Sequence, residues 1–217
     1  MNSKIPEFRE KLQKKLNPGR YEHSLSVAFT CICLAMRYGY PIDQAEVAGM
    51  LHDCAKGYDN DTIIRHCEKK GIEITEDERK APAVLHAKYG AWLAENTYDI
   101  HDQEILDAIA CHTTGKPAMG LLDKILYVAD YIEARRDKAE DLPVIRRLAF
   151  EDLDEALYQI LEGTLNYLGS KGAFVDPMTR KTYDYYKQQR KGETNVEIIG
   201  DGKTGKNCLR RQKSWRY

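Results

Sequence analysis

Apolar residues recur every three or four positions along most of the chain, which is the spacing of an α-helix with one buried face. A short segment of this kind runs from Glu7 to Leu16 and stops at Asn17-Pro18-Gly19. A longer one runs from about Arg20 to Tyr38 and ends at Gly39. Because Pro and Gly interrupt helices, these two segments are predicted as separate helices.

Polar residues with the spacing of helix caps mark where further helices begin. Asp43 with Glu46, and Thr75 with Glu78, have the three-residue spacing of a capping box, and the first pair predicts a helix as far as Lys56. The next predicted helix is capped by Asp61 or Asn60 and closes at Gly71. Further predicted helices are Val84–Asn96, Gln103–His112, one that follows Gly120 to about Ala139, and one from Pro143 towards Leu168. The pattern predicts an all-α bundle of about eight to ten helices, with no linker or repeat dividing residues 1–187.

The composition of the 217 residues is that of a globular protein. Hydrophobic residues make up 42% of the chain, too many for a disordered protein, and the length suits one domain with a sizeable core. The net charge of −1 gives no overall field that favours nucleic acid or an anionic membrane. The chain start lacks the apolar core of a signal peptide, the longest apolar stretch, Val27–Met36, is too short to cross a bilayer, and the six cysteines form no CxxC pair. We therefore expect a cytoplasmic protein without a membrane partner; no oligomeric state is predicted.

Residues 188–217 differ from the rest of the chain in charge and composition. They carry eight Lys or Arg residues against three acidic ones, so this tail is +5 while the remainder of the chain is −6. The segment is polar and Gly-rich, which favours a flexible basic appendage. A patch for nucleic acid or another partner is the alternative, and it rests on the tail alone.

His52 and Asp53 are the centre of the predicted chemistry. They end an amphipathic segment, and Lys56 follows three residues after Asp53, on the same face if the helix continues. A His, an Asp and a Lys near the buried side of a helix are costly without compensating partners. A dication beside the carboxylate and an anionic substrate beside the lysine would supply those partners.

Four more polar residues stand alone in apolar helical patterns. They are His23, His86, His112 and Asp130, each on a different predicted helix. Taken singly, each is more commonly an ordinary core or capping residue. Together with His52-Asp53 they form the ordered set H…HD…H…H…D over five helices, which is hard to explain as five independent core residues. His66 and His101 lie outside the set and are predicted to be solvated.

This ordered set resembles that of the HD-domain metal-dependent phosphohydrolases. The flanking residues narrow the resemblance: HDCAK at 52–56, HTTG at 112–115, and ADYIE at 129–133 followed by Arg136 are similar to the YqeK-type family. Members of that family are HD-domain symmetrical bis(5′-nucleosyl)-tetraphosphatases, which hydrolyse diadenosine tetraphosphate to two ADP. The likeness covers roughly residues 5–187 and implies an HD-domain helical bundle with a small-molecule nucleotide as substrate.

The resemblance implies a ligand set for metal. His23, His52, Asp53 and Asp130 would hold one ion, and His86 and His112, with Asp53 bridging, would hold a second. Such a nitrogen-rich set favours Fe, Mn or Zn over Mg²⁺, and the family's preference points to a di-iron centre, with manganese as the alternative. The metals would activate a water, so that no Ser or Cys nucleophile is needed. In a single-metal site, His86 and His112 would be free to hydrogen-bond or protonate phosphate.

A tetraphosphate also needs cations from the protein. Lys56 would hold a phosphate as a point charge, Arg136 could bind one in bidentate fashion, and Arg20, three residues before His23, could face phosphate as well. Thr113 could donate a hydroxyl to a phosphate oxygen. The segment from Gly172 to Thr179, with Phe174 and Thr179, resembles the family's late segment near the nucleoside, although a loop that caps a final helix explains it equally well.

Two other functions stay open from the sequence. An HD phosphohydrolase could act on another nucleotide, such as a cyclic dinucleotide, a guanosine alarmone or a deoxynucleotide. The chain could also be a nucleotide-binding sensor without turnover, although the complete ligand set and Lys56 count against that.

Overall fold

The computed structural model describes residues 4–200, with side chains to residue 190, and within this range every regular element is helical. The elements are α1 (Ile5–Lys15), α2 (Pro18–Tyr38), α3 (Ile42–Leu51), α4 (Asn60–Lys70), α5 (Glu76–Lys80), the 3₁₀ turn η1 (Pro82–Val84), α6 (Leu85–Tyr98), α7 (Gln103–Cys111), α8 (Leu121–Ile132), α9 (Leu142–Glu151), α10 (Leu153–Ser170) and α11 (Pro177–Gly200). The all-α prediction is confirmed, with slightly more helices than expected.

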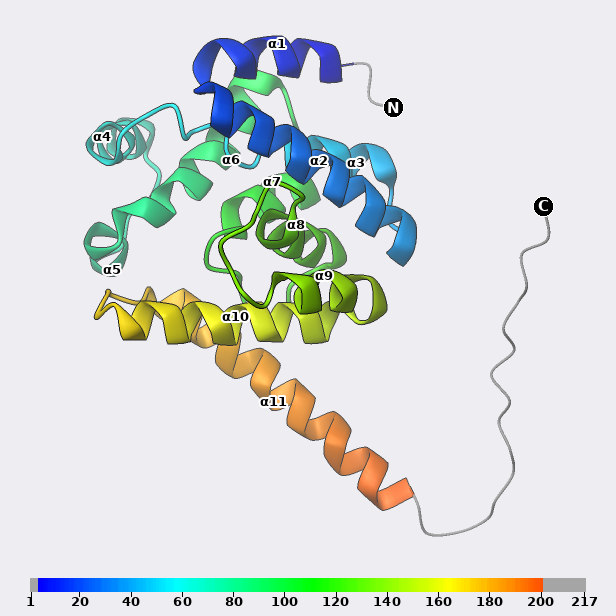
Figure 1. Cartoon of the computed structure of the whole chain (residues 1–217). Coiled ribbons are helices and arrows are strands. Elements are labelled where there is room, and N and C mark those ends of the chain that lie inside the picture. Colours follow the sequence, from blue (N-terminus) through cyan, green and yellow to red (C-terminus); the bar gives the residue numbers. More distant parts are fainter. Residues whose placement is uncertain (1–3, 201–217) are drawn as a thin grey trace, which may run out of the picture.

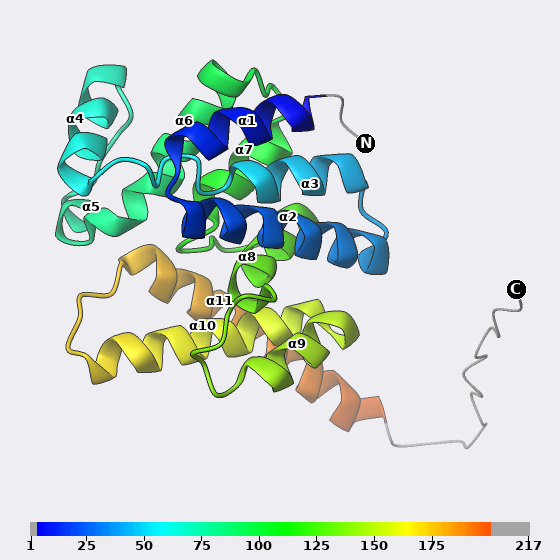
Figure 2. The same ribbon diagram turned by 45° about the horizontal axis from the view of Figure 1, so that its top comes forward.

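The helices pack around a core in which α7 and α8 are central. Figure 1 shows α2 and α3 side by side above this centre, α1 across their outer side, and α10 with α11 below it. In the rotated view α4 and α5 again lie together at one edge of the bundle, next to α6 (Figure 2). The core side chains are aliphatic and aromatic, among them Phe8, Leu34, Met50, Ile109 and Leu126, each almost fully buried.

Gly49 allows α2 and α3 to pack closely. A β-carbon at this position would lie 2.7 Å from Ala28 Cα and 3.0 Å from Cys31 Sγ, closer than packed atoms come. The close approach matters for the site, because His23 lies on α2 and His52 directly follows α3.

Replacing Gly49 with alanine is therefore expected to destabilise the fold, because overpacking a tight core costs about 1–3 kcal/mol. Thermal unfolding of Gly49→Ala should show a melting temperature lowered by several degrees, at about 2–4 °C per kcal/mol for a chain of this size. Gly169→Ala is the matched control, since no atom lies within 4 Å of the added β-carbon near the end of α10, and it should not lower the melting temperature. An unchanged melting temperature in Gly49→Ala would contradict this account of the α2–α3 contact.

Several predicted helix ends are wrong. The segment expected to continue through Lys56 ends as α3 at Leu51, and Glu46 is buried rather than part of a capping box. The helix from Gly120 ends at Ile132 instead of near Ala139, and α4 is capped by Asp59. The Thr75–Glu78 capping box is confirmed.

The predicted helix from Pro143 towards Leu168 is broken in two. Asp152 ends α9 in an extended conformation, with φ −146°, and its carboxylate then accepts a hydrogen bond from the Glu155 amide as the cap of α10. Farther on, α11 runs past the predicted boundary at residue 187 to Gly200. Residues 201–217, most of the predicted basic tail, lie outside the described residues. No helix in residues 4–200 is both long enough and apolar enough to span a membrane.

Candidate metal centre

The buried carboxylate of Asp53 lies between four histidine rings that come from different helices. On one side, its Oδ1 is 3.1 Å from His86 Nε2 and 3.6 Å from His112 Nε2. On the other side, its Oδ2 is 3.4 Å from His52 Nε2 and 3.8 Å from His23 Nε2. The structure therefore brings together all four histidines of the ordered set around a single carboxylate.

Asp130 completes the cluster from α8. Its Oδ1 lies 3.1 Å from His23 Nε2 and 3.9 Å from His52 Nε2. Two groups of possible ligand atoms, each within a span of 4.8 Å, result: His23 with His52 and Asp130, and His52 with Asp53 and His112. His52 belongs to both groups, so the two sets are contiguous.

The end of α3 explains how His52 and Asp53 reach the cluster. After Leu51 the chain follows a series of tight turns, in which Cys54 N bonds to Leu51 O at 3.0 Å and Lys56 N to Asp53 O at 2.9 Å. In these turns the adjacent His52 and Asp53 side chains both reach the cluster, with His52 Nε2 3.4 Å from Asp53 Oδ2. Gly57 ends the turns where a β-carbon would lie 2.7 Å from Lys15 O, so only glycine fits there.

The outer nitrogen of each ring is fixed by a hydrogen bond to an acceptor. Nδ1 of His52, His86 and His112 donates to the backbone carbonyls of Gly49, Ala83 and Ile109 at 2.8, 2.6 and 2.7 Å, respectively. A carbonyl only accepts, so these Nδ1 atoms carry the protons and a neutral ring presents the lone pair of Nε2 to the cluster. This second layer of hydrogen bonds is typical of histidines that bind metal.

The four inner nitrogens are crowded together, and two of them have no hydrogen bond among the described residues. Nε2 of His23 and of His52 are buried without a hydrogen bond, and Nε2 of His86 and of His112 face each other at 3.1 Å. Lone pairs so close to one another and to a carboxylate require protons or a cation between them. Imidazole nitrogens and carboxylate oxygens in this number suit a divalent transition metal, so the residues present fit such an ion.

The titration of these groups reflects their burial and mutual charge. Burial alone would raise the pKa of Asp53, but His52, His112 and His86 hold it well below its usual range. Burial lowers the pKa of His86 to about 4, against the opposing effect of Asp53. The carboxylate is therefore ionised at neutral pH and His86 is neutral, which are the protonation states of metal ligands.

Two arginines lie against the two carboxylates. Arg20 Nη1 is 2.7 Å from Asp53 Oδ2, and Arg136 Nη2 is 2.9 Å from Asp130 Oδ1. Arg20 is in the first turn of α2, whereas Arg136 is in the segment after α8 that was predicted to be helical. Both arginines stand next to the proposed ligands, with their remaining donors available to an anion.

Lys56 is half-buried beside the cluster. Burial lowers the pKa of its ammonium group, and the negative charge of Asp53 opposes that shift. No carboxylate of residues 4–190 forms an ion pair with it. A partly desolvated cation of this kind is suited to an anionic ligand.

The remaining predicted contacts lie farther out. Thr113 follows His112 and lines a cavity of about 500 Å³ between the ends of α5, α7 and the start of α11. Phe174 is 44% exposed, with the Lys80 ammonium 5.5 Å from its ring centroid, while Thr179 is buried in the first turn of α11. The structure places neither Phe174 nor Thr179 in contact with the cluster.

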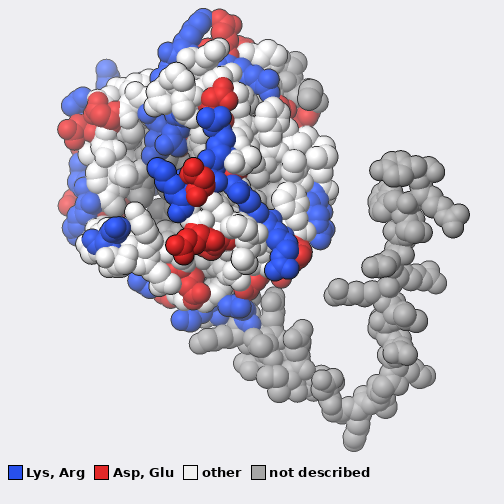
Figure 3. Space-filling model, viewed as in Figure 1, with Lys and Arg blue, Asp and Glu red and all other residues white. Residues whose placement is uncertain are grey.

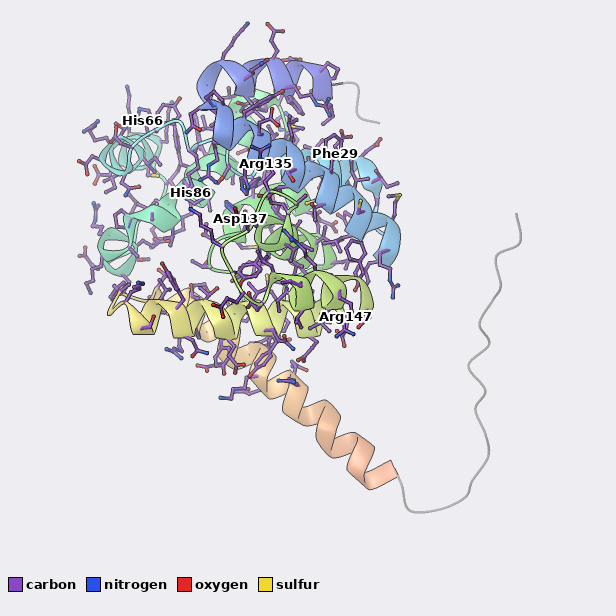
Figure 4. The ribbon with its side chains drawn as sticks, viewed as in Figure 1. Phe29, His66, His86, Arg135, Asp137 and Arg147 are labelled. Carbon is purple, nitrogen blue, oxygen red and sulfur yellow. The ribbon has the colours of Figure 1, made fainter. Side chains whose placement is uncertain are left out.

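His66 and His101 are separate from the cluster, as predicted. His101 is exposed and paired with Asp99 at 2.7 Å. His66 is half-buried rather than solvated, because its Nδ1 lies 2.7 Å from the Tyr89 hydroxyl and its ring packs against Tyr58. Figure 4 shows His66 on α4, away from His86.

Glu133 was missed as a site residue. Its buried carboxylate accepts from His23 Nδ1 at 3.1 Å and from the Arg135 amide at 2.7 Å, so it both orients His23 and ends α8. The signal available in the sequence was its position three residues after Asp130, within the ADYIE motif. It supplies the same support to His23 that carbonyls give the other three histidines.

Glu133→Ala should therefore weaken metal binding by about 10- to 100-fold, the usual cost of losing an outer partner of a metal ligand. Titration of metal-stripped protein with Mn²⁺ or Fe²⁺ measures this. Glu140→Ala is the control, because Glu140 is exposed in the same segment and should bind metal as the wild type does. Equal affinities for the two variants would remove Glu133 from the metal centre.

Residues 20–135, which include all four clustered histidines, match the HD domain. The chain belongs to the HD-domain family. The chain is similar to the symmetrical bis(5′-nucleosyl)-tetraphosphatase of Bacillus subtilis (strain 168), with 37% identity over 80% of this chain and 92% of the relative. The protein of the same name from Staphylococcus aureus (strain NCTC 8325 / PS 47) is 34% identical over 84% of this chain and 94% of the relative.

The same similarity holds in three dimensions. An HD superfamily hydrolase from Clostridium acetobutylicum, described as involved in NAD metabolism, superimposes with a TM-score of 0.83 and 35% identity over 85% of this chain and 97% of the other. The resemblance to HD-domain symmetrical tetraphosphatases expected from the sequence motifs is therefore confirmed.

Proposed function

We propose that this protein is a metal-dependent phosphohydrolase that cleaves diadenosine tetraphosphate symmetrically into two ADP. The observation that carries the metal dependence is the set of buried Nε2 atoms around Asp53, each on a ring whose Nδ1 is already bonded outward. The substrate comes from the relatives, which are named for this activity and are similar over most of their length.

The proposed ligands divide into two sets that share Asp53. His23, His52, Asp53 and Asp130 would hold one ion, and His86 and His112 with Asp53 a second; if only one ion binds, the rings of His86 and His112 contact phosphate instead. Iron is the metal we expect, with manganese as the alternative. When bound, the metal supplies Lewis-acid polarisation of the phosphoryl group and lowers the pKa of water.

The protein's own residues would bind and orient the polyphosphate. Lys56, which has no ion pair among the described residues, balances charge on the phosphate that is attacked. Arg20 and Arg136 keep donors free for flanking phosphates, and the Thr113 hydroxyl can donate to a phosphate oxygen from the rim of its cavity. Beyond Thr113, exposed Phe174 and the first turn of α11, which contains Thr179, would form the surroundings of one nucleoside.

The reaction needs no protein nucleophile. The oxygen of water attacks the second or third phosphorus, the bridging P–O bond between these phosphates breaks, and the departing ADP leaves with the electron pair of that bond. The proton released by water goes to solvent or to the phosphate product. Cys54, the cysteine next to Asp53, is no nucleophile, since burial raises the pKa of its thiol to about 12.

A panel of nucleotides tests the proposed substrate. Metal-loaded protein should hydrolyse diadenosine tetraphosphate faster than cyclic di-AMP, a guanosine alarmone or a deoxynucleoside triphosphate. Faster turnover of any of the other three would reassign the substrate within HD phosphohydrolases. Tight nucleotide binding by calorimetry without turnover in Fe²⁺ or Mn²⁺ would identify a sensor instead. The cytoplasmic location stays a prediction from the sequence.

A further inference from the structure

A second cavity, larger than the one beside Thr113, lies beside the metal centre. Its volume is about 910 Å³, within the range of small-molecule sites, and it lies between the start of α2, the segment after α8 and one face of α10. Arg20 and His23 line its inner end, so it reaches the cluster directly. Figure 4 places Arg135 and Asp137 on the segment after α8, at the face turned toward the viewer.

The cavity wall combines positive charge with an exposed aromatic ring. Arg135, Arg136 and Lys138 line it together with Arg20, and Lys and Arg side chains gather on this face with acidic groups between them (Figure 3). Two of the three acids of the wall have partners of their own: Glu133 pairs with His23, and Asp141 accepts from the Tyr131 hydroxyl at 3.0 Å, while Asp137 is the third. Among the four basic residues of the wall, Lys138 forms no ion pair within residues 4–190, and Arg135 makes only an exposed pair with Glu22 at 3.6 Å, so these two side chains can bind phosphate.

Tyr167 supplies a flat apolar surface in the same cavity. The side chain is 62% exposed on α10, an unusual exposure for a large aromatic residue, and Leu168 lies next to it in the lining. Its only described ring contact is the Lys171 ammonium at 5.9 Å, so one ring face can accept a partner. Aromatic rings of this kind stack on nucleobases.

The two carboxylate oxygens of Asp53 face different side chains. Oδ2 faces His23 and Arg20, which line the larger cavity, while Oδ1 faces His86 and His112, and His112 is followed in the chain by Thr113, which lines the smaller cavity. A substrate cleaved at its central bridge extends equally to both sides of that bridge, with one nucleoside at each end. The larger cavity is lined by His23 itself, and the smaller cavity by Thr113, the neighbour of His112 in the chain.

We propose that the larger cavity holds one of the two ADP halves, with Arg135 and Lys138 binding its phosphates and Tyr167 stacking on its base. The other half then extends past Thr113. This inference rests on the proposed function, because it assigns the second nucleoside of the same substrate. It adds Arg135, Lys138 and Tyr167 as residues that determine specificity for dinucleotides.

Substitution of Tyr167 tests the inference through substrate binding. Tyr167→Ala should raise KM for diadenosine tetraphosphate about tenfold, the size of a lost stacking contact, with metal content unchanged and kcat within about twofold. Phe29→Ala is the control, since Phe29 is 54% exposed on α2 and does not line the cavity; it should behave as the wild type. Lys138→Glu should raise KM at least as much as Tyr167→Ala.

Titration with ADP gives a second readout that does not depend on turnover. Wild-type protein loaded with Mn²⁺ should bind two ADP per chain in calorimetry, and Tyr167→Ala should lose or weaken one of the two sites. A wild type that binds a single ADP, or a Tyr167→Ala variant with unchanged KM and two unchanged sites, would overturn the inference. A wild type that fails to hydrolyse diadenosine tetraphosphate would instead overturn the proposed function, while the ADP titration still tests the cavity.

Discussion

Asp53→Asn should lose bound metal and hydrolytic activity together. The carboxylate lies within 3.8 Å of the Nε2 atoms of all four histidines, and an amide of the same shape removes the negative charge that a shared cation requires. Since losing even an outer partner of a ligand costs about 10- to 100-fold, we expect activity to fall by more than about 100-fold. Metal content by elemental analysis and kcat/KM for diadenosine tetraphosphate measure the two losses.

Asp61→Asn is the matched control for this substitution. Asp61 is exposed in the first turn of α4, so the same change in charge and shape is made away from the cluster. The control should keep its metal and its activity, and circular dichroism should show both variants folded. An Asp53→Asn protein with near-normal activity would refute the metal centre as described.

Lys56→Met should separate catalysis from metal binding. Methionine keeps much of the side chain's length and apolar surface but removes the charge, and the metal ligands are untouched. Losing one charged group that stabilises developing charge on phosphate costs about 100- to 1000-fold in turnover, so we expect kcat to fall in that range at unchanged metal content.

Lys69→Met provides the comparison for Lys56. Lys69 is an exposed lysine near the end of α4, and its substitution should change neither kcat nor metal content. Loss of metal in Lys56→Met would show that the lysine supports the ligands instead of the substrate. Unchanged kcat would show that the substrate's charge is balanced by other groups, such as Arg20 and Arg136.

The sequence predicted where helices occur better than where they end, and two of the wrong ends lie at the metal centre. The period of apolar residues indicates α3, but the turns that follow depend on the contact of Gly57 with the Lys15 carbonyl, a tertiary contact absent from any local pattern. For the same reason the continuation of α8 past Ile132 was wrong, since the Glu133 side chain both ends the helix and binds His23.

The candidate ligands could be selected because they are polar residues in apolar helical faces. His23, His86 and Asp130 are polar residues at positions where the surrounding pattern predicts apolar ones. Functional residues are often found at such positions. Glu133 could not be selected in this way, because it follows the last turn of α8, where a carboxylate is unremarkable. Arg135, Lys138 and Tyr167 face a common cavity only because α10 packs beside the segment after α8, which no sequence spacing shows.

The products of diadenosine tetraphosphate test the central claim most directly. Metal-loaded wild-type protein is incubated with the dinucleotide, and the nucleotides are separated by anion-exchange chromatography at early times, with a metal-stripped sample in parallel. ADP as the only initial product, and none from the stripped sample, is the result expected for symmetrical cleavage at the His and Asp cluster. AMP with ATP, or equal ADP formation without metal, would contradict it.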